Sequence, residues 1–338
     1  MKLFKKTNEK KTEQEKVEER REEVLATGRK FKYPLQWTRS RIVGSTILIA
    51  IVMFALVLIG GWIALYRLNM TDELLFRITQ VFPISVASVD SENVRFSDYL
   101  MLYRSSIISI ERQSANQTNE EALNYLRTEY KRSALSEAEK YTYAIKLAKE
   151  QDIAVSDSEI DDEFTRHLTI GGTNRGEPSF LKIIEDNFGL TKSEYRRMLY
   201  LNLVKAKVSM AIDDRANRLA SSVESILAAN DNDYNAVIGE LSDQVVYEET
   251  GGLVDSKNID GGRASAAMRL EPGQSSGKFV SMNGDGYYFV KLIDKTDTEV
   301  NFVSIKVPFT EFEERFATLK EENKISEFIE LKQPDQTE

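Results

Sequence analysis

The longest apolar run in the chain extends from Ile42 to Tyr66, contains no charged residue, and lies between Arg41 and Arg67. As a helix it would be about 37 Å long, more than the ~30 Å of hydrocarbon in a bilayer. A secretory signal core is usually only ~7 to 15 residues long, and no small-x-small cleavage site follows this run. The alternative, a buried helix of a soluble protein, would have to be apolar around its whole circumference. We therefore expect residues 42–66 to be a transmembrane helix that stays attached.

Beyond residue 86 the apolar positions recur at intervals of three and four, which predicts amphipathic helices that pack on one another. One such helix is expected to begin at Ser97, and a second, longer pattern covers about residues 120–151. Two capping boxes, at residues 156–159 and 191–194, predict the first turns of two more helices. We expect four or five helices and no strands, so residues 86–212 should form an all-α domain.

The pattern changes after residue 213, where short alternating apolar runs and glycine-rich turns follow two further helices. Alternation over a few residues between such turns predicts β-strands. Residues 213–331 should therefore form a small α+β domain, followed by a tail at residues 332–338. The expected elements are helices at residues 213–229, 234–241 and 311–323 and strands at residues 278–282, 287–293, 300–307 and 325–331.

The charges that flank the apolar run predict its orientation. Residues 1–41 carry thirteen Lys and Arg against seven Glu, a net charge of +6, whereas the rest of the chain carries 32 basic and 47 acidic residues, a net charge of −15. Because basic residues next to a span stay on the cytoplasmic side, residues 1–41 should be a cytoplasmic tail. Residues 67–85 then form a connector. We expect a single-pass protein of the plasma membrane, most of it extracytoplasmic.

Composition excludes several kinds of chemistry. The chain has no cysteine and one histidine, His167, so it offers no thiolate nucleophile, no disulfide and no zinc-thiolate site. We expect no metal site and no cofactor, and we interpret His167 as a surface or helix-end residue. The acidic balance beyond the span argues against nucleic acid as a partner, since phosphate binding requires a basic face.

Three stretches of the helical half, residues 86–99, 144–164 and 188–208, resemble the N-terminal chaperone module of the SurA, PpiD and PrsA foldases. The other half is similar to the parvulin family of peptidyl-prolyl isomerases. That resemblance rests on the glycine pair at residues 251–252, the turn at residues 270–277 and the strand GYYFVKLID at residues 286–294. The first parvulin strand is missing before residue 213, and residues 300–307 resemble it, which suggests a circular permutation.

The parvulin resemblance implies a peptide-binding groove with an altered site. Parvulins place two histidines facing each other, and these positions are Tyr288 and Phe302 here. The acid or thiol of the family site falls on Gln244, and the aromatic of the proline pocket falls on Arg263. Since no histidine remains in the site, we expect weak or lost isomerase activity, with Tyr288 as the best candidate for a catalytic residue. The groove is expected to contain Gln244, Ile259, Met268, Tyr288 and Phe302.

Three functions follow from these resemblances. The first is a membrane-anchored extracytoplasmic foldase that binds unfolded secreted polypeptides, with the translocon as a candidate partner. The second is an active prolyl isomerase in which Tyr288 donates a hydrogen bond to the substrate. The third is a non-catalytic envelope-assembly protein that reuses the fold. A homodimer is a further candidate assembly, because helical domains of this kind often leave an apolar face for a partner.

Overall fold

The computed structural model describes residues 12–114, 120–168, 176–258 and 260–331, and the chain divides into two compact units at residues 64 and 65. The first unit is dominated by one long helix, α1 (Glu13–Trp62), whose first turn is capped by Thr12 and Glu15. A π-helical turn, Ile63–Arg67, continues it. Within the described residues, Ile42–Arg67 is the one segment long and apolar enough to cross a membrane.

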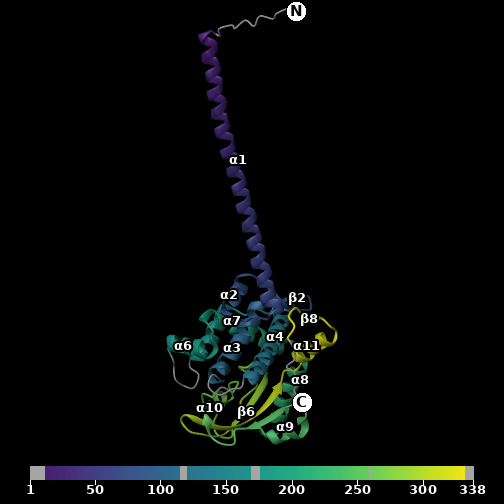
Figure 1. Ribbon diagram of the computed structural model, residues 1–338. Helices are drawn as coiled ribbons and strands as arrows, with labels where there is room; N and C mark the ends of the chain where they lie inside the picture. Colours follow the sequence, from purple (N-terminus) through teal and green to yellow (C-terminus); the bar gives the residue numbers. More distant parts are fainter. Residues whose placement is uncertain (1–11, 115–119, 169–175, 259, 332–338) are drawn as a thin grey trace, which may run out of the picture. The chain divides into compact units, whose positions relative to one another are not determined.

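The second unit begins with a short helix that the sequence did not indicate and continues with five helices of the expected kind (Figure 1). The capping box predicted at Thr191 is present, since its side chain accepts from the backbone N–H of Glu194 while the Glu194 carboxylate accepts from the Thr191 N–H. Gly189, with φ +62°, ends the preceding helix in the left-handed conformation. The helices are α2 (Glu73–Val81), α3 (Phe96–Ser114), α4 (Glu120–Glu150), α5 (Asp157–Leu168), α6 (Glu177–Phe188) and α7 (Lys192–Ile212).

The expectation that this region has no strands is wrong. A hairpin of β1 (Ser85–Val89) and β2 (Glu92–Arg95) precedes α3, and β8 (Ile325–Glu327) joins it from the far end of the chain in the order β2-β1-β8. The hairpin turn consists of Asp90 and Ser91, both with positive φ, the geometry that matches the twist of paired strands. The region remains predominantly helical, and the predicted fold class is confirmed with this small sheet added.

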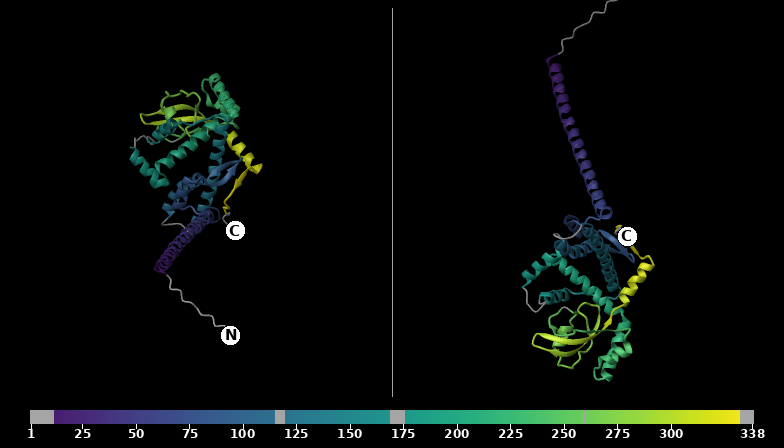
Figure 2. Two further views of the ribbon diagram at one scale, coloured as in Figure 1. Left: turned by 90° about the horizontal axis from the view of Figure 1, so that it is seen from above. Right: turned by 60° about the horizontal axis from the view of Figure 1, so that its bottom comes forward.

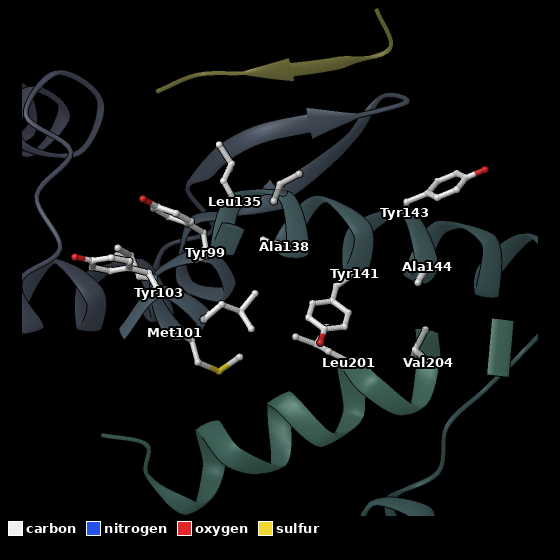
Figure 3. Packing of buried hydrophobic residues seen from close by; sticks show 14 of the residues in the cluster. Tyr99, Met101, Tyr103, Leu135, Ala138, Tyr141, Tyr143, Ala144, Leu201 and Val204 are labelled. Carbon is white, nitrogen blue, oxygen red and sulfur yellow. The ribbon is translucent and has the colours of Figure 1, made fainter. Parts of the chain in front are cut away.

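The helical region has one continuous hydrophobic core, and α4 lies at its centre (Figure 3). Leu135 points from α4 toward the β1-β2 hairpin, whereas Tyr141 points toward Leu201 of α7. Both faces of α4 are therefore covered, which explains the run of buried residues along a helix whose overall composition is polar. Burial of such side chains contributes roughly 1.5 to 3 kcal/mol each.

The remaining part of the second unit is a sheet region with helices on both faces. The sheet has the order β3-β7-β6-β5, with β4 also paired to β7. Tyr287 and Phe289 of β6 pack on α8 and α9, while Val290 and Leu292 pack on α10, as expected when alternate side chains point to opposite faces. The elements are α8 (Asp214–Ala229), α9 (Tyr234–Leu241), β3 (Val246–Glu249), β4 (Val254–Asp255), α10 (Arg263–Met268), β5 (Phe279–Val280), β6 (Gly286–Lys295) and β7 (Glu299–Pro308).

The end of the chain does not stay with the sheet region. The helix α11 (Glu311–Glu321) returns to the helical region, as Figure 2 shows in yellow. Its residues Phe312, Phe316 and Leu319 belong to the helical core, and β8 then pairs with β1. The expected domain at residues 213–331 therefore ends structurally near residue 308. Sequence order suggested otherwise because α11 follows the sheet directly and its apolar face does not reveal its partner.

Candidate functional site

The site predicted from the sequence centres on Tyr288, which lies on the face of β6 that α10 covers. Only 3% of its surface is exposed. Its ring packs on the ring of Phe279, with 6.1 Å between centroids, and on the backbone of Gly261. A Cβ atom at residue 261 would lie 3.3 Å from the ring and 2.8 Å from the hydroxyl of Ser281, and φ there is +76°. Glycine is therefore required beside the ring.

Two cations lie against the faces of this ring. The guanidinium carbon of Arg263 is 4.9 Å from the ring centroid and the Nζ of Lys306 is 5.9 Å from it, both within cation–π range. Arg263 also forms an ion pair with Glu248 of β3 and donates from Nε to the carbonyl of Asp260, at 2.8 Å. These contacts hold Arg263 over the tyrosine, where the parvulin resemblance implies an aromatic wall.

Asp285 completes the cluster at the start of β6. Its carboxylate forms an ion pair with Lys306 and accepts a weak hydrogen bond, 3.4 Å long, from the Tyr288 hydroxyl. Burial alone would raise the pKa of Asp285, but hydrogen bonds from Lys306 and Ser281 and the charge of Lys306 outweigh it, so the pKa lies below its ordinary value. Burial and the charge of Asp285 raise the pKa of Tyr288. The tyrosine therefore stays protonated and the aspartate ionised at neutral pH.

The structure places the other expected groove residues apart from this cluster. Phe302 is opposite Leu292, whereas the residue opposite Tyr288 is Lys306, so the two supposed histidine positions do not face each other. Phe302 and the partly buried Met268 belong to one packed core under α10. Gln244 lies in the exposed turn between α9 and β3, and Ile259 lies outside the described residues.

Sequence reasoning missed Lys306, Asp285 and Ser304 as members of the site. Ser304 is 1% exposed and accepts from Arg263 at 3.4 Å. A signal was present, because Ser304 and Lys306 are alternate polar residues in the apolar stretch Phe302–Pro308 of β7 and so share a face. A polar residue at such a position needs a partner inside the fold. The partner could be identified only once β6 and β7 were paired in register.

As arranged, the cluster suits structural positioning better than catalysis. The Tyr288 hydroxyl could donate a hydrogen bond to a substrate only if the ring were accessible, and the ring is covered by Gly261, Phe279 and Arg263. The ion pair between Asp285 and Lys306 joins the start of β6 to β7. Asp285 lies in the turn of the β5-β6 hairpin, one of the parts of the sheet region that reach the helical region.

The tip of that hairpin contacts α7 very closely. A Cβ atom at Gly284 would lie 2.3 Å from the Cβ of Ala206, and φ at Gly284 is +68°. Only glycine fits between the hairpin and a small residue of the helix. Cavities open on both sides of this contact, and Asn283, which is exposed, lines both of them.

We name the first cavity the α5 cleft, which has a volume of about 240 Å³ and lies between α5 and the loop before α10. The sole histidine lines it. His167 lies in the last turn of α5, one of the two expected positions, but it is partly buried: its Nδ1 lies 2.5 Å from the Tyr195 hydroxyl and its Nε2 lies 3.0 Å from Glu163. Burial and the neighbouring charge of Arg166 lower the pKa of His167.

We name the second cavity the α7 cleft, which has a volume of about 350 Å³. Glu137, Lys205 and Glu313 line its helical side, and Lys205 lies 2.9 Å from Glu137 and 3.7 Å from Glu313. Phe309 and Phe312 add apolar surface. The α7 cleft therefore has both charged and apolar walls.

Comparison with known protein families identifies the family to which the helical region belongs. A family model described as a SurA-like N-terminal domain matches residues 35–208, slightly more than half of the 338 residues. No curated protein matches the chain. The matched segment contains α2 to α6, the β1-β2 hairpin and α7 as far as residue 208, so the region predicted to be a chaperone module is confirmed as one. The chain therefore belongs to the family of chaperones and foldases that carry a SurA-like N-terminal domain.

Proposed function

We propose that the protein is a membrane-anchored extracytoplasmic foldase that binds unfolded polypeptides along the seam between its helical and sheet regions. The family match over residues 35–208 carries this proposal. It is supported by the α5 and α7 clefts, which flank one hairpin and share Asn283. The apolar run at residues 42–66 and its basic N-terminal flank support the anchor and the orientation.

We expect the sheet region to be a permuted parvulin-like domain without prolyl isomerase activity. The central position of β7, between β3 and β6, is where a strand displaced from the start of the domain would complete the sheet. Tyr288 is 3% exposed and faces Lys306, and neither feature favours catalysis on a peptide. The region would then contribute binding surface and not a catalytic step.

Client binding is tested with the full chain in lipid nanodiscs. Light scattering of a chemically unfolded client, diluted into buffer, should fall as the protein is added. Asn283→Trp should weaken this protection, because residue 283 lines both clefts and the larger ring would narrow the space beside it. Ser222→Trp, at an exposed position on α8, is the matched control and should leave protection intact. Equal scattering with and without the wild-type protein would refute the proposal.

Two further measurements separate the alternatives. Uncatalysed X-Pro isomerisation takes tens to hundreds of seconds, so catalysis is easily detected. We expect the protein not to accelerate isomerisation of an X-Pro peptide. If the wild-type protein does accelerate it and Tyr288→Phe does not, an active isomerase would be favoured instead. A photocrosslinking residue at position 283 should capture many extracytoplasmic polypeptides. Capture of one defined partner would favour the envelope-assembly function.

A further inference from the structure

The short helix α2, which follows the apolar span, carries an exposed apolar stripe. Leu74, Ile78, Val81 and Phe82 are exposed by 72%, 38%, 75% and 58%. Leu74, Ile78 and Val81 are spaced by four and three residues, so they share one face of the helix, and Phe82 follows directly at its C-terminal end. Phe76, on another side of the helix, is only 2% exposed and packs in the helical core. The helix α2 therefore has two apolar faces: one packs in the core of the protein, and the other is exposed.

Polar contacts fix the direction in which the stripe points. Glu194 of α7 forms an ion pair with Arg77 and accepts from the Nε2 of Gln80 at 2.7 Å. The guanidinium of Arg104 lies 5.1 Å from the centroid of the Phe76 ring and pairs with Glu73. Held at both ends, α2 cannot rotate to bury its stripe against the protein.

The chain connects this stripe closely to the apolar span. The span ends at Arg67 and α2 begins at Glu73, so five residues separate them, and the two ends are at most about 22 Å apart. Leu65 and Tyr66, the last residues of the span, belong to the second unit, where Leu65 is buried and the Tyr66 hydroxyl donates to the carbonyl of Ser85 at 2.6 Å. The start of α2 therefore stays within a short distance of the point where the span would leave the membrane.

The residues that connect the span to α2 include further exposed apolar side chains. Leu68 is 63% exposed and Met70 is 40% exposed, while the backbone between them is held in place. Lys131 donates to the carbonyl of Asn69 at 2.8 Å, and the Asn69 side chain donates to the carbonyl of Glu330 at 2.9 Å. The exposed apolar side chains from Leu68 to Phe82 thus belong to one ordered segment.

We propose that this segment lies in the interfacial layer of the membrane, on the non-cytoplasmic side, with the α2 stripe inserted among lipid headgroups and upper acyl chains. The inference rests on the proposed membrane anchor. Amphipathic helices bind membranes in this way when an apolar face is free. The tether favours lipid over any other occupant, because it keeps the bilayer at high effective concentration. The folded unit would then have a second membrane attachment and a restricted orientation.

The absence of cysteine makes the test direct, since single cysteines can be introduced for spin labels. The full chain is reconstituted in vesicles of phosphatidylcholine and phosphatidylglycerol, and labels are placed at positions 74, 78 and 81. Position 56, within the span, is the lipid control, and position 222, on α8, is the water control. Oxygen partitions into the bilayer and a charged nickel chelate stays in water. Labels on α2 should be relaxed by oxygen far more than by nickel, as at position 56.

The outcomes separate this inference from the proposed anchor. If position 56 reports lipid while positions 74, 78 and 81 respond to nickel as position 222 does, the interfacial position of α2 is wrong and the anchor stands. If position 56 also reports water, the anchor itself fails. Labels on α2 that are shielded from both reagents would mean that protein covers the stripe, either a second copy or a client, and would also overturn the inference.

Discussion

Asp213 joins the two places where the chain passes between the helical and sheet regions. It is 1% exposed and caps α8, accepting from the N–H of Ala216 at 2.8 Å. Its other oxygen accepts from the N–H groups of Thr310 and Glu311 at the start of α11, at 2.7 and 3.1 Å. One carboxylate therefore satisfies the first turns of two helices, and Asp213→Ala removes all three bonds.

The free energy of unfolding lost in Asp213→Ala follows from these three hydrogen bonds. Loss of a helix N-cap destabilises by about 1 kcal/mol. Each hydrogen bond from a partly buried N–H to a charged group contributes about 1.5 kcal/mol or more. The sum is about 4 kcal/mol, equivalent to roughly a thousandfold change in an equilibrium constant. Asp213→Asn keeps one acceptor oxygen, loses one or two of the three bonds, and should cost about 2 kcal/mol.

Hydrogen exchange of the full chain, measured by mass spectrometry, resolves the effect by segment. Amides of α8 and α11 should lose protection together in Asp213→Ala, by up to about a thousandfold if they exchange by local opening. The control is Asp214→Ala, which removes the same charge from an exposed neighbouring position. If α11 exchanges equally in both variants, Asp213 does not hold the two connections and the reasoning is refuted.

Two other predictions concern the packing of the second unit. Burial raises the pKa of Glu139 to about 7, against ~4.3 when exposed, so stability should be fully present below pH ~4 and fall by about 3 kcal/mol as the pH rises through 7. The free energy of unfolding, measured in urea at several pH values, should lose this pH dependence in Glu139→Gln but keep it in Glu137→Gln. An unchanged pH dependence in Glu139→Gln would show that Glu139 does not cause it. Gly284→Ala should lower the thermal midpoint, because its Cβ would overlap Ala206, at a cost of about 1 to 3 kcal/mol. Gly277→Ala is the control and should leave the thermal midpoint unchanged, because nothing lies within 4 Å of the new Cβ atom. Equal midpoints for the two variants would show that the hairpin contact is not tight.

The elements predicted best are those with local causes. The capping box at Thr191 and the long apolar period of residues 120–150 depend on neighbours within a turn or two, and both appear where the sequence indicated. The strand near residues 300–307 was also identified, because its alternation is strong. By contrast, α2 and the β1-β2 hairpin were missed, since each is short and its stability depends on packing against α3 and α4.

The candidate site was predicted less well than the fold. Tyr288 was correctly placed on a strand, but its neighbours Arg263 and Lys306 come from α10 and β7, and their positions depend on register. A shift of two residues in that register would change every cross-strand partner while keeping the same face. The alternation in β7 places Ser304 and Lys306 on one face, but which side chains meet them was decided by the register of β6 and β7.

By itself, the sequence determined the apolar span, the charge asymmetry across it, the change from helical to alternating periodicity, and the family of the helical region. These depend on composition and on contacts between residues close in the chain. Only the tertiary structure decided that α11 and β8 return to the helical core, that Tyr288 is covered, and that α2 leaves an apolar stripe exposed. Those features arise from contacts between distant segments, because burial depends on what the rest of the chain places against each residue.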